Sequence, residues 1–294
     1  MRYAYTMYNK IVSSIKNYPT SNLVYSSMSA FAHLGNGELP GTWFVRALTE
    51  LGHSPNAIRQ TLFRLTKQGE LEAHKLGRQK FYSSSNYMRK EISVGLEKIF
   101  MPPSQTWDGL WTMVQYSFEG EERNDRERLR SILNLIGFAP LGTGLYVHPQ
   151  DHSQAIADVV QENDLTGSVR IFRSRQLSGE NDRRLVKDLW NLTELARQFR
   201  TFQVNAQKIE PLISSANNQQ AFQMRYFVVM EILRIAWSDP DLPISLLPAS
   251  WPGYKARAAA KSLYQRLLDP ATEHAREILE RSQHTEKEKS RRTV

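Results

Sequence analysis

The sequence of 294 residues predicts a multidomain α+β protein with three parts. Three observations lead to this prediction. Two short helix patterns followed by a hairpin pattern lie within residues 42–82, strands alternate with helices over residues 111–172, and helical periodicity dominates from about residue 182. We therefore expect domains at residues 1–103, 104–181 and 182–294, with the first boundary at the helix-breaking Pro102-Pro103-Ser104.

Residues 42–82 follow the order of a winged helix-turn-helix. A first helix is expected over residues 42–51, and it ends at Gly52, which suits a left-handed backbone. Ser54 is a good N-cap for a second helix over residues 55–68, with proline at its first position. Two β-like runs around Gly77 then predict a hairpin with a cationic tip. This order is typical of a unit that binds DNA.

The second helix has two different faces. Ile58, Leu62 and Leu65 form an apolar stripe at helical spacing, so this side should face a core. Arginine, asparagine and glutamine can bond a base edge in two places, and lysine suits phosphate. The predicted DNA-binding residues are Asn56, Arg59, Gln60, Arg64 and Lys67 on the helix, and Lys75, Arg78 and Lys80 on the hairpin. Phe63 shares the polar face. The alternative is an ordinary solvated helix.

The net charge is concentrated in the same region. The whole chain carries a formal charge of +8, and residues 1–100 hold 13 Lys and Arg against 6 Asp and Glu. The remaining residues hold 25 basic and 24 acidic side chains. A localised positive surface is expected of a phosphate-binding module. A membrane surface would also attract it, but no basic amphipathic helix with a large apolar face is visible.

The composition limits the class of protein. A hydrophobic content of 40%, with 10% aromatic residues, is enough for packed cores, and only the tail from about residue 283 has the composition of a frayed segment. The absence of cysteine excludes disulfides, thiolate metal sites and cysteine nucleophiles. No run of 18 apolar residues predicts a membrane-spanning helix, and the first residues lack a signal-peptide core. We expect a cytoplasmic protein.

The first two parts contain further expected elements. In the first, helices are expected over residues 21–34 and 86–100. In the middle part, the expected order is a strand at 111–118, a helix at 123–136, a Gly-interrupted strand pattern at 138–147, a helix at 153–163 and a strand at 168–172. Such alternation over a short stretch favours an α+β sandwich of ferredoxin-like type.

The C-terminal part should be helical, with helices over residues 191–209, 217–237 and 254–281 and a possible break at Pro270. The helix at 217–237 is apolar on all sides, which indicates burial on more than one face. Either it is a core helix with a dimer contact, or part of it lines an aromatic ligand pocket. Glu231 and Arg234 have the spacing of an ion pair. An unpaired arginine could anchor a carboxylate or phosphate. The predicted effector-binding residues are Arg225, Arg234, Trp237 and Trp251.

Catalytic signals are weak. The chain has no GxSxG, HExxH or phosphate-binding GxxxxGK[ST] motif. His148 and His152 have i, i+4 spacing, but the intervening Pro149 disfavours a helix, so a pair of surface residues is the simpler interpretation. Asp108 is the one acidic residue near the start of the first middle-domain strand, where ferredoxin-like nucleases hold a metal. We predict no enzyme activity, cofactor or metal, and keep a metal-dependent nuclease and an RNA-binding protein as alternatives.

Several of these segments together resemble the PaaX family of repressors, related to the regulator of phenylacetate degradation. The resemblance covers nearly the whole chain. It rests on residues 58–65 leading to Gly69 and Leu71, and on the hairpin residues 77–82. It also rests on Trp107-Asp108-Gly109, on the glycines of residues 137–144, and on the proline-rich stretch 239–257 with its Trp251-Pro252-Gly253-Tyr254.

The resemblance implies a winged-helix head, a middle domain similar to the CRISPR-associated ferredoxin-like fold, and a helical C-terminal domain. It implies a homodimeric repressor that binds a palindromic DNA operator, controls an aromatic catabolic operon, and is released by an aromatic acid or an aryl-coenzyme A thioester such as phenylacetyl-CoA. It places DNA-reading positions at Arg59, Arg64 and Arg78. The segment before Ser21 is longer and more aromatic than the usual N-terminal segment of the family.

Overall fold

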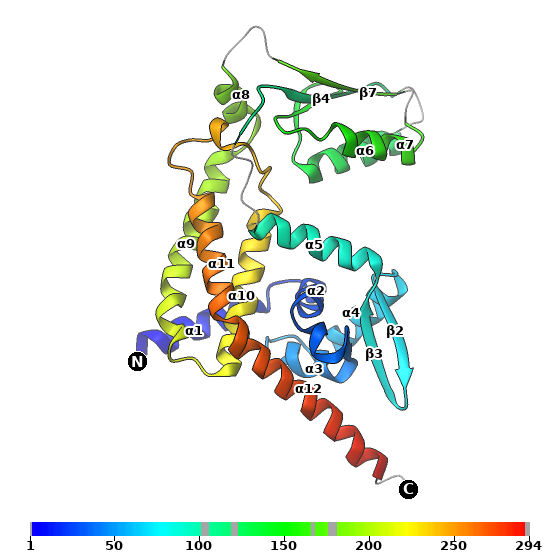
Figure 1. Cartoon of the computed structure of the whole chain (residues 1–294), viewed down its shortest axis with the longest axis vertical. Coiled ribbons are helices and arrows are strands. Elements are labelled where there is room, and N and C mark those ends of the chain that lie inside the picture. Colours follow the sequence, from blue (N-terminus) through cyan, green and yellow to red (C-terminus); the bar gives the residue numbers. More distant parts are fainter. Residues whose placement is uncertain (1, 101–105, 119–122, 166–167, 176–180, 292–294) are drawn as a thin grey trace. The chain divides into compact units, whose positions relative to one another are not determined.

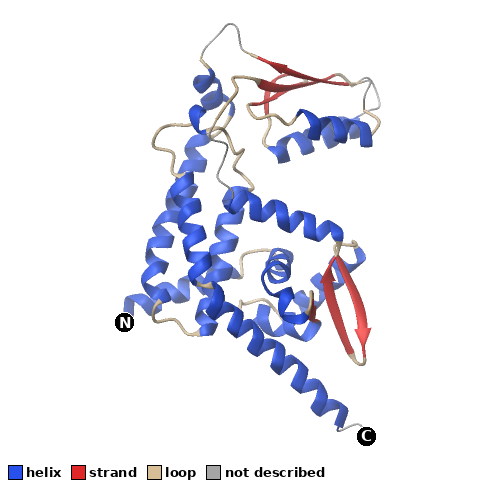
Figure 2. Cartoon of the chain, in the orientation of Figure 1, coloured by secondary structure: helices blue, strands red, loops and turns tan. Residues whose placement is uncertain are grey.

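The computed structural model describes all residues except 1, 101–105, 119–122, 166–167, 176–180 and 292–294. The chain divides into two compact units, each built from separate segments. The first unit comprises residues 1–100, 201–234 and 255–294, and the second comprises residues 101–200 and 235–254. Each unit contains one small sheet (Figure 2). The prediction of a mixed α+β protein is confirmed.

The N-terminal segment of the first unit combines helices with a three-stranded antiparallel sheet of order β1-β3-β2. The predicted helices and the hairpin are all present, whereas the first helix and the first strand had not been predicted. The elements are α1 (Arg2–Ile15), α2 (Thr20–Phe31), the 3-10 turn η1 (Ala32–Gly35), β1 (Glu38–Pro40), α3 (Gly41–Thr49), α4 (Pro55–Lys67), β2 (Leu71–Leu76), β3 (Gln79–Ser84) and α5 (Asn86–Phe100).

The predicted C-terminal helices are also present: α9 (Leu192–Ile213), α10 (Asn218–Ala236), α11 (Gly253–Arg266) and α12 (Leu268–Arg291). The predicted break is confirmed: a new helix starts just before Pro270, where the missing N–H of proline costs no helical hydrogen bond. Helix α12 runs to Arg291 and so includes most of the segment from residue 283 onward. In the described part of the chain, no helix has the length and apolar character needed to cross a membrane.

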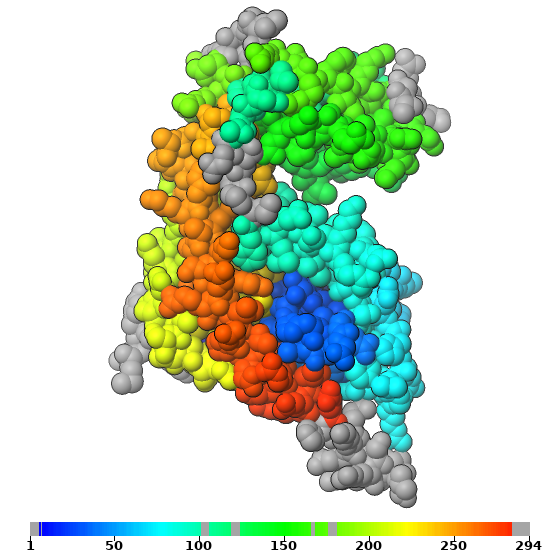
Figure 3. Space-filling view, in the orientation of Figure 1, coloured from blue at the N-terminus to red at the C-terminus, as the bar shows by residue number. Residues whose placement is uncertain are grey.

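Helices from the C-terminal half complete the core of the first unit. Figure 1 shows α12 passing along α2 and α3. The Phe222 ring of α10 stacks on Phe31 of α2 at 5.5 Å between centroids, and the hydroxyl groups of Tyr226 and Ser27 lie 2.6 Å apart. The helix predicted to be buried on several faces is therefore a core helix, and its partners include the N-terminal helices. Figure 3 shows α12 against this N-terminal segment at the molecular surface.

The second unit contains the predicted ferredoxin-like arrangement. Its elements are β4 (Trp111–Tyr116), α6 (Arg123–Ile136), β5 (Ala139–Gly142), β6 (Leu145–His148), α7 (Ser153–Glu162) and β7 (Val169–Ser174), followed by α8 (Asp182–Leu189) and the 3-10 turn η2 (Ile244–Leu246). The antiparallel strand order is β5-β6-β4-β7, and both helices cover one face of the sheet (Figure 1). Their buried residues Leu129, Leu133 and Ile156 pack with Val114 of the sheet.

A glycine fixes the β5–β6 turn. Gly144 has a φ of +71°, and a Cβ atom there would lie 2.5 Å from the backbone oxygen of Tyr116. The Gly-interrupted strand pattern at residues 138–147 is therefore a hairpin of two short strands, as expected for a glycine-containing turn between two strand halves. Position 144 needs glycine for both its backbone angle and its space.

Candidate nucleic-acid interface

Helix α4 begins and packs as its sequence predicts. The Ser54 side-chain oxygen accepts a hydrogen bond from the backbone N–H of Ala57 at 3.2 Å, which satisfies one of the free donors at the helix start. Ile58, Leu62 and Leu65 are at most 2% exposed. Because this stripe is buried, the rotation of the helix is fixed and the opposite face points to solvent.

That opposite face carries the side chains predicted to bind DNA. All eight predicted residues are exposed: Asn56, Arg59, Gln60, Arg64 and Lys67 on α4, and Lys75, Arg78 and Lys80 on the hairpin. Arg64 donates a hydrogen bond to the side chain of Gln68 at 2.8 Å, one turn further along the helix. The helix and the hairpin belong to the same compact unit, and α4 contacts β2 directly.

The hairpin concentrates positive charge at its tip. Lys75 and Lys80 are directly opposite each other in the β2–β3 register. Like charges at such a position destabilise a strand pair in the absence of a counterion. The turn between them contains Gly77 with a φ of +61°, followed by Arg78. Three cations around a tight turn are electrostatically suited to a polyanion such as a phosphate backbone.

The turn between α3 and α4 is anchored by a histidine. His53 is 9% exposed, and its Nδ1 atom lies 2.9 Å from the hydroxyl oxygen of Thr20 on α2. Burial lowers the pKa of His53, and a backbone hydrogen bond with Ile15 opposes this effect in part. The folded turn therefore favours the neutral form of the His53 ring.

Helix α12 contacts α3 and the first residue of β3. The indole N–H of Trp43 on α3 donates to the backbone oxygen of Ala275 at 2.9 Å. Gln79 of β3 donates to the side chain of Thr42 at 2.8 Å and to the backbone oxygen of Ser282 at 3.4 Å. Sequence reasoning missed this contact. The available signal was the stripe Ala271, Ala275 and Ile278 at helical spacing, and each of these residues is at most 1% exposed.

The four predicted effector-binding residues have different surroundings. Arg225 is 1% exposed, with its guanidinium 5.0 Å from the Phe31 ring centroid and 4.5 Å from that of Tyr264. Its Nε atom has no hydrogen-bond partner among the described residues. Arg234 pairs with Glu231 at 3.5 Å, as its spacing predicted.

The two tryptophans differ in exposure. Trp237 is 38% exposed, whereas Trp251 is 8% exposed and packs edge-on against Phe199 at 6.0 Å. Arg225 and Arg234 belong to the first unit, and both tryptophans belong to the second.

Two cavities in the second unit differ in charge. The larger, of about 390 Å³, has an apolar lining that includes Leu192, Leu246 and Trp251, and its cations are Arg183, Lys187 and Arg200. No carboxylate lines it, and none of the described residues forms an ion pair with these three cations. A volume in this range is typical of small-molecule sites.

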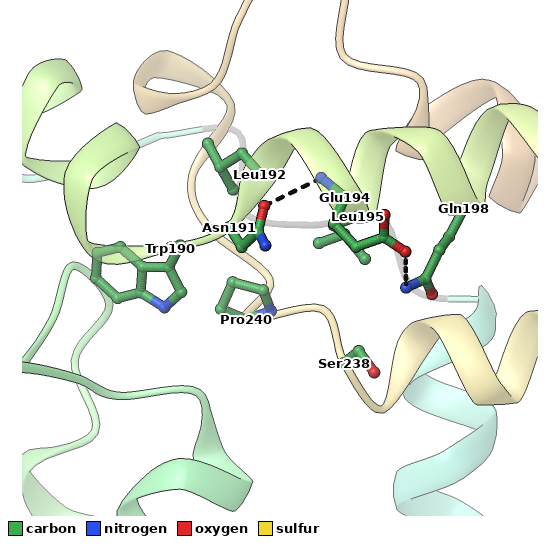
Figure 4. A pocket seen from close by; sticks show the side chains of 8 residues that line it. All are labelled: Trp190, Asn191, Leu192, Glu194, Leu195, Gln198, Ser238 and Pro240. Carbon is green, nitrogen blue, oxygen red and sulfur yellow. Dashed lines mark hydrogen bonds between the residues drawn. The ribbon is translucent and has the colours of Figure 1, made fainter.

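The smaller cavity, of about 180 Å³, lies at the start of α9 beside Trp190 (Figure 4). Its one charged lining residue is the carboxylate Glu194, which accepts a hydrogen bond from Gln198 at 3.0 Å. An anionic ligand is therefore better suited to the larger cavity.

The residues considered for a metal site have other roles. Asp108 forms an ion pair with Arg173, and its second oxygen accepts from the backbone N–H of Leu110 at 2.8 Å. His148 is fully buried and bonds to Pro240 and Gln150, so its assignment as a surface residue was wrong. Within the described ranges, no three His, Asp or Glu side chains gather in a way that could hold a metal ion.

Comparisons with known proteins point to the same family over most of the chain. Family models match in three consecutive stretches: "PaaX-like protein" at residues 29–87, "PaaX protein central Cas2-like domain" at 104–186 and "PaaX-like protein C-terminal domain" at 190–277. The transcriptional repressor PaaX of Escherichia coli strain K12 is 30% identical over 234 residues, which cover 76% of this chain and 72% of that protein.

A solved structure is similar in fold. The uncharacterized protein Rv0674 from Mycobacterium tuberculosis has a TM-score of 0.51 at 22% identity, and the match covers 78% of this chain and 90% of that one.

Proposed function

Because the chain belongs to the PaaX family, we propose that it is a transcriptional repressor, and not an enzyme, whose first unit binds operator DNA. One observation carries this proposal: the exposed polar face of α4 and the three cations of the adjacent hairpin lie in one compact unit. As a protein that acts on the genome, it should work in the cytoplasm of a bacterial cell.

We assign α3, the following turn and α4 as a helix-turn-helix, and the β2–β3 hairpin as its wing. In this assignment α4 enters the major groove with Arg59, Gln60 and Arg64 toward base edges, while Lys67 contacts phosphate. Lys75, Arg78 and Lys80 contact the neighbouring backbone. The buried stripe of α4 and the His53 turn support this geometry, because they fix the direction of the exposed face.

The repressor should act as a homodimer on a palindromic operator. One recognition helix reads only a few base pairs, and two half-sites about one helical turn apart multiply its specificity.

The effector should be an aromatic acid or an aryl-coenzyme A thioester such as phenylacetyl-CoA, and the target an aromatic catabolic operon, as expected from the family resemblance. The large cavity beside Trp251 supports a ligand of this class, because its apolar wall suits an aromatic ring and its three cations suit carboxylate or phosphate groups. Arg225, buried without a carboxylate partner among the described residues, also has the properties of an anion anchor. Arg234 and Trp237 stay predictions from the sequence.

The DNA-binding proposal is tested with promoter DNA upstream of the protein's own and neighbouring genes. The wild type should retain a specific duplex, and the double variant Arg59→Ala, Arg64→Ala should lose about 1–3 kcal/mol per bidentate base contact. The control Arg128→Ala, Arg170→Ala removes two exposed arginines from the second unit and should bind normally. Unchanged operator affinity in a folded Arg59/Arg64 variant would contradict the assignment. Preference for RNA, or cleavage with Mg²⁺ or Mn²⁺, would favour the RNA-binding or nuclease alternative.

A further inference from the structure

The most exposed large hydrophobic residue among those described is Phe63 on α4. Its side chain is 67% exposed, and no other aromatic ring or cation among the described residues stacks on it. Singly exposed hydrophobic residues are common on protein surfaces, so exposure alone carries no conclusion. The position of Phe63 on the helix suggests a function for this exposed ring.

Phe63 lies at the centre of the face proposed to bind DNA. At about 100° per residue, Asn56, Arg59 and Lys67 fall within about 40° of it around the helix axis, and Gln60 lies about 60° away. The buried residue Leu65 lies about 160° away, on the opposite side. A helix in the major groove brings the centre of its exposed face closest to the base pairs. Phe63 is therefore the side chain of α4 placed to reach furthest into the groove.

The edges of the bases limit what an apolar ring can contact there. Guanine, adenine and cytosine present hydrogen-bonding groups in the major groove, and an apolar ring against them removes water without replacing its hydrogen bonds. Thymine presents its C5-methyl group beside its one acceptor, so it offers an apolar surface to a phenyl ring.

We propose that Phe63 is a specificity-determining residue that contacts the C5-methyl group of a thymine in each operator half-site. This inference rests on the proposed DNA binding by α4. The flanking Arg59 and Lys67 hold the helix to the duplex through polar contacts, and Phe63 lowers the affinity for operators that lack the methyl group at this one position. The chemistry that it recognises is a methyl group, so 5-methylcytosine is expected to substitute in part for thymine.

The test removes single methyl groups from the DNA. In a specific operator, each thymine is replaced in turn by deoxyuridine, which differs from thymine by the methyl group alone. At one position per half-site the replacement should weaken wild-type binding about fourfold, the effect expected for one buried carbon group. Phe63→Ala should bind the thymine and uracil operators equally. Because Phe63 is exposed, its replacement by alanine leaves no cavity in the core. Circular dichroism checks that the variant is folded.

A matched control separates this effect from general loss of an exposed hydrophobic residue. Leu135 on α6 of the second unit is 62% exposed, and Leu135→Ala should keep both the wild-type affinity and the wild-type sensitivity to the missing methyl group. Specific wild-type binding with no sensitive thymine, or the same sensitivity in Phe63→Ala, overturns the role of Phe63 and leaves the repressor proposal intact. Failure of the wild type to prefer any duplex overturns both.

Discussion

The Nε2 atom of His274 on α12 lies 2.7 Å from the carboxylate oxygen Oε2 of Glu50, the residue that caps the C-terminal end of α3. His274 is 4% exposed, so this contact is inside the first unit. Together with the Trp43–Ala275 hydrogen bond, it fixes a helix from the last part of the chain to the first helix of the proposed helix-turn-helix. The stability of the proposed DNA-binding surface therefore depends on residues of α12, a helix that is not part of that surface.

Trp43→Phe should destabilise the first unit by about 1–3 kcal/mol. The change removes the indole donor, leaves the carbonyl of Ala275 without this partner, and reduces the volume of a fully buried side chain. The free energy of unfolding is measured by chemical denaturation. Trp237→Phe, at a partly exposed indole in the second unit, is the control and should change it by less than about 0.5 kcal/mol. Equal stability of the two variants would show that α12 is not fixed through Trp43.

Removing the three hairpin cations should reduce the salt dependence of DNA binding. In Lys75→Ala, Arg78→Ala, Lys80→Ala, three phosphate contacts are lost, and the slope of log affinity against log salt should become less steep by about 2–3. Fluorescence anisotropy over a salt series measures the slope. A control with three exposed cations removed elsewhere, Arg128→Ala, Arg170→Ala, Lys208→Ala, should keep the wild-type slope. A hairpin variant with the wild-type slope means that the wing does not contact phosphate.

Acidification should destabilise the turn between the two helices through His53. Burial lowers the pKa of His53, so near pH 6.5 the unfolded chain binds a proton that the folded chain does not. This contribution to stability is fully present above about pH 6.5 and is lost as the pH falls below it. Denaturation curves between pH 8 and pH 5 should show a smaller loss of stability in His53→Gln than in the wild type. His33→Gln changes an exposed histidine and should follow the wild type. Identical pH profiles for all three proteins would contradict the role of His53.

The cavity beside Trp251 should bind the effector through its cations. Phenylacetyl-CoA and phenylacetate are titrated calorimetrically into the full chain. In Arg183→Gln, Lys187→Gln, Arg200→Gln, the affinity of a compound that releases DNA should fall at least about tenfold, the effect of one lost charge-assisted hydrogen bond. Operator affinity without ligand should stay unchanged. If the triple variant binds the compound normally and Arg225→Met does not, the site is at Arg225.

Local patterns predicted the elements of the proposed DNA-binding surface well. The start of α4 is specified by Ser54 and Pro55, and its buried face by the apolar stripe from Ile58 to Leu65. Both signals are readable in the sequence because capping and helical periodicity involve residues that are close together in the chain. The alternating strands and helices of the second unit were predicted for the same reason.

Contacts between distant segments were not predictable in this way. β1 is three residues long, ends in proline, and forms only by pairing with β3. Helix α1 had no assigned role, yet Ile11 and Ile15 are buried, and the Tyr8 hydroxyl donates to Gln223 of α10. Trp43 and Ala275 are 232 residues apart. No local rule relates such residues, because their contact depends on how the whole unit packs.

The assembly of the first unit from three separated segments has a consequence for synthesis in the cell. The ribosome makes α3, α4 and the hairpin early, but α12, which carries Ala275, begins only at Leu268. At about 5–20 residues per second, tens of seconds or less separate the two events, and during this interval Trp43 lacks its partner. A nascent chain therefore exposes a basic helix and hairpin whose supporting core is incomplete. The proposed binding to operator DNA should therefore begin only once α12 has left the ribosomal tunnel.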